Sequence, residues 1–157
     1  MEISIRKMVQ SDLPRVIEIL AHWNMAPVAA SPVNPTPERC NIPVENSFVA
    51  LDGHRLVGTC SYILLSDEMA ETASLAVDPR YRGKGIGYML QKRRLKEMKK
   101  NGIKRVKTEA DRPQTIRWYT SKFDYKIIGQ NKKKHSFSLP EVEYWTVMEL
   151  DLQDYDI

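Results

Sequence analysis

The stretch from residue 73 to residue 98 constrains the fold of this chain more than any other part of the sequence. It starts with the apolar run A-S-L-A-V, which ends at Asp78-Pro79, and after a loop it continues into residues 86–98, where apolar side chains recur at helical spacing. The loop carries the string R-G-K-G-I-G. Glycine lets the backbone come close to a ligand, and the N–H groups and positive dipole end of a helix start attract phosphate oxygens. The stretch therefore predicts a strand, a phosphate-binding loop and a helix.

The spacing of the glycines distinguishes between kinds of phosphate site. A dinucleotide-binding G-x-G-x-x-G would need a glycine where the chain has Tyr88, and the P-loop string G-x-x-x-x-G-K-[ST] does not occur. Residues 82–87 instead read R-x-x-G-x-G, and residues 75–82 read L-A-V-D-P-R-Y-R. This combination resembles the acyl-CoA signature of the GNAT family of N-acetyltransferases. The alternative is a glycine turn without a ligand, which is the weaker interpretation because strand, Asp-Pro, loop and basic helix all agree.

The remaining elements occur in the order that the resemblance implies. Asp52-Gly53 separates two apolar runs, which predicts a β-hairpin. Residues 26–43 hold five of the nine prolines and are read as a loop. Strands are predicted at residues 2–6, 47–51, 56–65, 69–77, 105–110, 125–129 and 144–152, and helices at residues 12–20, from the glycine loop to Asn101, and at residues 114–122.

The resemblance to the GNAT family extends over nearly the whole chain. It implies an α/β (α+β) fold with a mixed central sheet of six to seven strands, helices on both faces, and two strands that splay apart at the acyl-CoA cleft. A length of 157 residues suits a single domain, so we expect one GNAT acetyltransferase domain over residues 1–157.

The charge of the chain is mildly positive. Lys and Arg total 24 against 20 acidic residues, and the excess gathers at residues 92–107 and 132–134. Such a bias suits a polyanionic cofactor, a nucleic acid, or a solvated helix face. The acidic residues at 149–156 and the lack of a helix-turn-helix or RNP-like string argue against a nucleic-acid partner.

Cysteines and apolar runs limit the remaining classes of site. Cys40 and Cys60 lie far apart, with no C-x-x-C and no histidine at ligand spacing, so we expect no metal site, no redox pair and a reduced intracellular compartment. The longest apolar stretch, residues 62–65, is too short to cross a membrane, and the first residues do not resemble a signal peptide. We therefore expect a cytoplasmic protein with no membrane partner, and a homodimer stays open.

The resemblance implies acetyl-CoA as the cosubstrate. Its pantetheine arm would lie between the splayed strands, and the amine acceptor would attack the thioester directly, without a covalent enzyme intermediate. The acceptor would be a primary amine of a small molecule or a protein. The resemblance assigns the arm to the backbone of Leu75, Ala76 and Val77, and the pyrophosphate to the backbone N–H groups of Arg82, Gly83, Lys84, Gly85, Ile86 and Gly87.

A general base must take a proton from the amine. Glu71 stands eleven positions before Arg82, where the histone-acetylating branch of the family carries its glutamate. Strand alternation would place Glu71 on the face shared by Ala73, Leu75 and Val77, so that its carboxylate points into the cleft. Glu109, on the following strand, is the reserve candidate, and in many relatives water serves instead.

A tyrosine in the penultimate helix often protonates the leaving thiolate in this family, within a string like Y-x-K-x-G-F. The corresponding stretch here is W-Y-T-S-K-F-D-Y. The position of the family's tyrosine corresponds to Thr120 in this chain, and Tyr119 stands one position earlier. We expect Tyr119 to be the acid, and the alternative is an aromatic side chain that only packs beside Trp118. Two other classes of function stay open, a non-catalytic acyl-CoA-binding module and a nucleic-acid or phosphate-binding protein.

Overall fold

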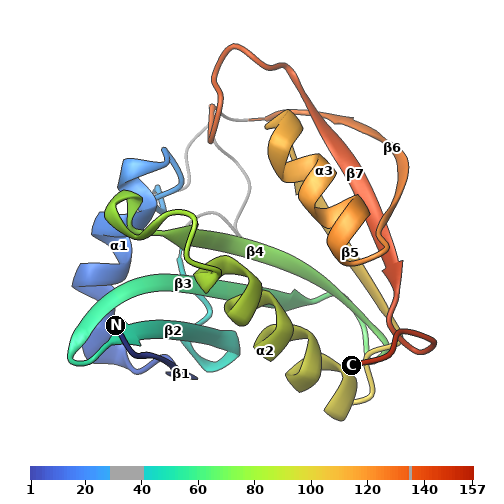
Figure 1. The fold of residues 1–157 in the computed structure, drawn as a ribbon. Coiled ribbons are helices and arrows are strands. Elements are labelled where there is room, and N and C mark those ends of the chain that lie inside the picture. Colours follow the sequence, from blue (N-terminus) through green and yellow to red (C-terminus); the bar gives the residue numbers. More distant parts are fainter. Residues whose placement is uncertain (29–40, 135) are drawn as a thin grey trace.

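The structure is a computed structural model that describes residues 1–28, 41–134 and 136–157 (Figure 1). The central part of the predicted 26–43 loop and Cys40 lie outside these described residues. All the predicted strands and helices are present. Their bounds are β1 Ile3–Lys7, α1 Leu13–His22, β2 Ser47–Asp52, β3 Arg55–Leu64, β4 Met69–Val77, α2 Ile86–Lys100, β5 Arg105–Ala110, α3 Pro113–Lys122, β6 Lys126–Lys132 and β7 Tyr144–Asp151.

The strands form one mixed sheet in the order β1-β2-β3-β4-β5-β7-β6. Neighbouring strands are antiparallel except β4 and β5, which run parallel. One apolar cluster packs α1 onto one face of the sheet, and a larger cluster packs α2 and α3 onto the other. Figure 1 shows α2 in front of β2, β3 and β4, with α3 beside β5 and β7. The predicted fold class, a mixed sheet with helices on both faces, is confirmed.

Two turns explain where elements end. In the β2–β3 hairpin, Asp52 still pairs with Arg55, so the turn residues are Gly53 and His54 rather than the predicted Asp52-Gly53, and Gly53 takes the left-handed φ of 61° that glycine tolerates. Helix α2 ends as predicted at Asn101-Gly102. Gly102 has a φ of 84°, and the two N–H groups that follow Asn101 bond back to carbonyls of the last turn, the usual C-terminal cap.

Strands β4 and β5 stay together only at one end. Their pairing covers three residues on each strand and stops at Glu71 and Lys107. Just beyond it, the buried Thr72 hydroxyl donates to the Thr108 hydroxyl at 2.5 Å, and after that the two strands diverge (Figure 1). We call the diverging part of these two strands the splay.

A β-bulge in β4 lies within the splay. Ser61 and Thr59, two residues apart in β3, pair with Ala73 and Ala76, which are three residues apart in β4. The extra residue is accommodated at Ser74, whose φ of 56° is unusual for a residue with a side chain. A bulge of this kind shifts the alternation of side chains, so the part of β4 after Ser74 cannot continue the pattern of the part before it.

Candidate functional site

The glycine loop joins β4 to α2 and leaves backbone N–H groups open. Gly83 and Gly85 have φ values of 73° and 79°, a conformation that favours glycine. The first hydrogen bond within α2 runs from Met89 N to the Gly85 carbonyl at 3.1 Å, so the N–H groups of residues 86–88 have no earlier turn to bond to. A Cβ added at Gly83, Gly85 or Gly87 would meet no atom within 4 Å. The loop therefore offers free donors and open space, which is what a phosphate group needs.

A buried carboxylate holds the start of this loop. Asp78 accepts a hydrogen bond from Arg80 N at 3.0 Å and so caps the short 3₁₀ helix Pro79–Tyr81. It also binds the guanidinium of Arg15, on α1, at 2.6 Å and that of Arg80 at 3.0 Å. Because these bonds join the loop to α1, the loop is fixed relative to the end of β4.

The indole of Trp23, the residue that directly follows α1, lies at the open end of the splay. The Trp23 Nε1 donates to the Val77 carbonyl at 2.9 Å. The guanidinium groups of Arg82 and Arg112, from the two sides of the splay, each lie 5.5 Å from the Trp23 ring. Two residues of the predicted cofactor set, Val77 and Arg82, thus meet at Trp23, and in this structure the Val77 carbonyl already has a partner.

The prediction that Glu71 shares one face of β4 with Ala73, Leu75 and Val77 is wrong. Leu75 and Val77 pack against the apolar cluster under α2 and α3. Glu71 and Ala73 instead line a small pocket on the side of α1. The reason is the bulge at Ser74, which inverts the alternation between these two pairs. The Glu71 side chain therefore faces away from Leu75 and Val77.

The two predicted carboxylates lie on either side of one ammonium group. Lys107 Nζ is 3.7 Å from a Glu71 oxygen and 3.6 Å from a Glu109 oxygen. Asn131 donates to the other Glu109 oxygen at 3.3 Å. The Glu71 and Glu109 side chains are only 19% and 13% exposed, so the cluster is a mostly covered group with a formal charge of one negative unit. The structure thus brings both candidate bases to the same side of the sheet.

The pocket beside Glu71 is small, and polar and apolar atoms contribute almost equally to its walls. Among its lining residues Glu71 alone carries a charge. A cationic or neutral amine suits this pocket better than an anion, because the carboxylate would repel a negative group. The lining residues, all from the described part of the chain, are Met25, Pro27, Asn41, Ile42, Pro43, Ile63, Glu71, Ala73, Ser74 and Phe137.

A buried ion pair fixes the segment that carries Phe137. Lys133 Nζ lies 2.7 Å from Asp111 and also donates to the Leu139 carbonyl at 2.8 Å, and the Ser138 hydroxyl donates to Asp111 at 2.7 Å. Burial alone would raise the pKa of Asp111, but the hydrogen bonds from Lys133, Leu139 N and Ser138 outweigh burial and hold this pKa below its usual value. Residues 137–139, which precede β7, are therefore held against the end of β5.

The two candidates for the thiolate acid point in different directions. The Tyr119 oxygen is buried and accepts a hydrogen bond from Arg94 at 3.2 Å, and Arg94 also binds the Ala73 carbonyl in the splay at 3.2 Å. The Thr120 hydroxyl donates to carbonyls of its own helix at 3.1 and 3.2 Å. Of the two, Tyr119 is the side chain whose polar atom is connected to the splay.

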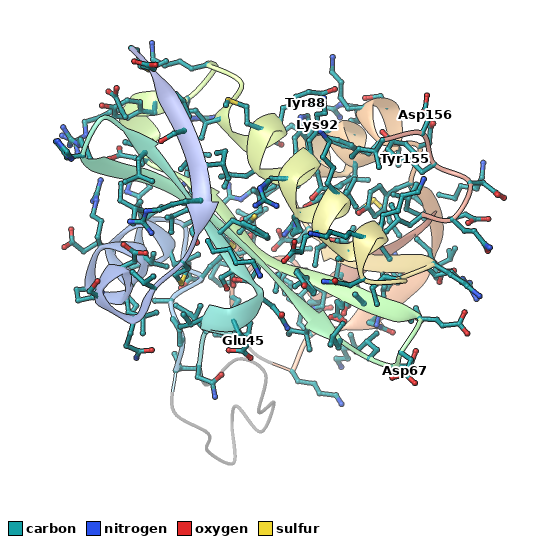
Figure 2. All side chains as sticks on the ribbon, turned by 90° about the horizontal axis from the view of Figure 1, so that it is seen from below. Glu45, Asp67, Tyr88, Lys92, Tyr155 and Asp156 are labelled. Carbon is teal, nitrogen blue, oxygen red and sulfur yellow. The ribbon has the colours of Figure 1, made fainter. Side chains whose placement is uncertain are left out.

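Of the basic residues at 92–107, Arg94 alone is buried, and the others are exposed or half-buried. On the outer side of α2, Lys92 Nζ lies 5.4 Å from the ring of the exposed Tyr88. Figure 2 shows this pair with Tyr155 and Asp156 of the C-terminal segment nearby. A solvated helix face therefore explains most of the positive charge of α2.

The buried thiol is not a nucleophile at neutral pH. Burial raises the pKa of Cys60 to about 11, and its Sγ lies 3.6 Å from the Leu90 carbonyl. Within the described residues, no three His, Cys, Asp or Glu side chains gather in a way that could hold a metal ion. No helix in the described part of the chain has the length and hydropathy of a membrane span.

Three contributors to this site went unnoticed in the sequence. Arg94 did leave a signal, because every fourth position from Ile86 to Met98 faces the sheet and the only charged residue at these positions is Arg94. Trp23 and Asp111 left none, because their partners come from distant parts of the chain.

The model of the acetyltransferase (GNAT) family matches residues 13–125. A search of curated proteins found no match. The ribosomal-protein-S18-alanine N-acetyltransferase of Escherichia coli has a similar structure, with a TM-score of 0.78 and 18% identity over 99% of this chain and 97% of that one.

Two further solved structures were determined with a bound cofactor. The yncA protein of Salmonella typhimurium, solved with its cofactor acetyl-CoA, has a TM-score of 0.74 and 18% identity over 100% of this chain and 98% of that one. Rv2747 of Mycobacterium tuberculosis, in complex with CoA and NLQ, has a TM-score of 0.64 and 19% identity over 80% and 73%. These likenesses show the fold, and the family match extends over more than half of the sequence. The chain belongs to the acetyltransferase (GNAT) family.

Proposed function

We propose that this protein is an acetyl-CoA-dependent N-acetyltransferase that acetylates a primary amine by direct attack on the thioester. One observation carries the proposal. The open N–H groups of the glycine loop adjoin a splay that has a carboxylate, Glu71, on one side and a phenol, Tyr119, on the other. A phosphate site, a place for an extended arm and two proton-handling groups are what this reaction requires.

The residues present fit acetyl-CoA. The space beside the loop glycines is open, which leaves room for the pyrophosphate. Within the splay, β4 does not pair with β5, which leaves room for the pantetheine arm. When bound, acetyl-CoA supplies an activated thioester carbonyl. The Val77 carbonyl accepts one hydrogen bond from the Trp23 indole, so a contact with the cofactor would use its second lone pair. The cofactor-binding set that we propose is Leu75, Ala76, Val77, Arg82, Gly83, Lys84, Gly85, Ile86 and Gly87.

We assign the proton transfers to two side chains. As the amine nitrogen bonds to the carbonyl carbon and the carbon–sulfur bond breaks, Glu71 takes a proton from the amine, directly or through one water, and Tyr119 gives a proton to the departing sulfur. Glu109 forms an ion pair with the same Lys107 ammonium as Glu71 and is the alternative base. No covalent enzyme intermediate is needed, which agrees with the raised pKa of Cys60.

The pocket beside Glu71 guides the choice of acceptors. Its single carboxylate favours an amine over an anion, so the panel covers alkyl and aryl amines and the free α-amino groups of peptides. Peptides belong in the panel also because the structural neighbour from Escherichia coli is an N-acetyltransferase of a protein alanine. A cytoplasmic location and a homodimer stay predictions.

A thiol-release assay over this amine panel, together with calorimetry, tests the function. We expect acetyl-CoA to bind and CoA to be released only when an amine is present. Binding of acetyl-CoA without transfer to any amine would favour the non-catalytic acyl-CoA-binding module. Binding of an oligonucleotide in place of acetyl-CoA would favour a nucleic-acid-binding protein and contradict the proposal.

A further inference from the structure

Arg94 is a buried cation at the place where the two halves of the sheet separate. Its side chain comes from the middle of α2 and is completely buried, at a position where the neighbouring turns carry Leu90 and Met98. Burial of a charge is costly unless its hydrogen bonds are complete, and an apolar residue of similar size would often be no less stable. The presence of arginine at this position therefore calls for a role other than packing.

Each of the five N–H donors of the guanidinium has an acceptor. Nη1 donates to the Ser61 carbonyl at 2.9 Å and to the Ala73 carbonyl at 3.2 Å. Nη2 donates to the Tyr119 hydroxyl at 3.2 Å and to Gln91 Oε1, which also accepts from Nε at 2.9 Å. All these acceptors are formally neutral, so the side chain joins groups rather than balancing a charge.

The guanidinium connects two parts of the site that no strand pairing holds together. Ala73 directly precedes the bulge residue Ser74 in β4, and Tyr119 belongs to α3, on the other side of the splay. Beyond Glu71, β4 and β5 have no ladder of hydrogen bonds. Because a guanidinium is planar and rigid, bonds to its two Nη atoms fix both the separation and the direction of their acceptors.

We propose that Arg94 is a positioning residue for acetyl transfer, which holds the Tyr119 hydroxyl in register with the bulged backbone of β4. The inference rests on the proposed function, because it needs Tyr119 as the proton donor. Arg94 does not touch the reacting atoms in this account. It acts by keeping the phenol within reach of a thioester that lies along the splay, where a displacement of 1 Å can cost about a hundredfold in rate.

A second buried tyrosine provides a matched control. Tyr125 packs beside Tyr119, with ring centroids 5.0 Å apart, and it is equally buried. Its hydroxyl accepts from Gln91 Nε2 at 3.1 Å and has no hydrogen bond with Arg94. Tyr125→Phe therefore removes a phenol oxygen from the same core and leaves the direct Arg94–Tyr119 bond in place, since Tyr125 is connected to Arg94 only through Gln91.

The test is a double-mutant cycle on the full chain, with kcat for the best amine of the panel and the calorimetric Kd of acetyl-CoA as the two readouts. Arg94→Met and Tyr119→Phe are each expected to lower kcat by about 10- to 100-fold and to leave the Kd unchanged. The variant with both changes should be no slower than the slower single variant, because Arg94 acts through Tyr119. Tyr125→Phe should keep the wild-type kcat. Arg94→Lys should stay slow, because an ammonium on a flexible stem cannot replace the planar fork.

Several results would overturn the inference. These are a wild-type kcat in Arg94→Met, losses that multiply in the double variant, or a kcat and an acetyl-CoA affinity that fall together with the melting temperature. If Arg94→Met does not fold, Arg94→Lys takes its place in the same cycle. An absence of transfer by the wild-type protein would overturn the proposed function and the inference together, whereas transfer by the wild type with multiplying losses would overturn the inference alone.

Discussion

Replacement of Gly87 by alanine separates cofactor binding from folding. Gly87 is the second residue of α2, it lies outside the left-handed region, and a Cβ at this position would meet no atom within 4 Å. Glycine in a helix is less stable than alanine by about 0.5–1 kcal/mol. Gly87→Ala is therefore expected to raise the free energy of unfolding by up to this amount, and the melting temperature by about 1–4 °C.

The same change should weaken acetyl-CoA binding. If the N–H groups of residues 86–88 hold the pyrophosphate, the new methyl group lies where the phosphate approaches the backbone. Loss of one hydrogen bond to a charged group costs about 1.5–3 kcal/mol, which is roughly a 10- to 150-fold rise in Kd. Calorimetry with acetyl-CoA measures the Kd, and differential scanning calorimetry measures the melting temperature of the same sample.

Gly102→Ala is the matched control, because Gly102 ends the same helix far from the loop. Its φ of 84° requires glycine although its Cβ position is also open. This variant should lose about 1–2 kcal/mol of stability and keep the wild-type Kd. A Gly87→Ala protein that is more stable than the wild type and binds acetyl-CoA just as tightly would refute the assignment of the pyrophosphate to this loop.

Three further predictions concern the proton-handling groups and the buried ion pair. Glu71→Gln should lower kcat by about a hundredfold to ten-thousandfold with acetyl-CoA binding preserved, and an unchanged kcat would transfer the role to Glu109 or to water. Thr120→Val should keep the wild-type kcat in the thiol-release assay. A lower kcat in this variant and an unchanged kcat in Tyr119→Phe would instead show that position 120, where the family pattern places the tyrosine, provides the acid. Because the pKa of Asp111 is lowered in the folded state, its carboxylate adds stability above about pH 4 that disappears as the pH falls through the lowered pKa. Asp111→Asn, which leaves a buried ammonium unpaired, should cost about 3–5 kcal/mol in urea unfolding at pH 7 and less in acid, and a pH-independent difference would contradict this account.

The sequence alone determined the parts of this protein that depend on neighbours along the chain. The glycine spacing at residues 82–87 identified the loop, and the apolar run that ends at Asp78-Pro79 located the end of β4. Gly102 marked the end of α2 because only glycine takes this conformation without cost. Local backbone preferences and side-chain periodicity act over a few residues, so they can be read without the fold.

Only the tertiary structure decided which side chains lie on the same face of the sheet and which contact one another. Alternation predicted that Glu71 and Leu75 point the same way, yet an extra residue at Ser74, fitted against β3, turns them to opposite sides of the sheet. The helical spacing placed Arg94 among sheet-facing positions, but only the fold brought its partners, the backbone carbonyls of two strands and the Tyr119 hydroxyl, around its guanidinium. The physical reason is the same in both cases. Strand register and the satisfaction of a buried charge depend on partners that the chain brings together only when it folds.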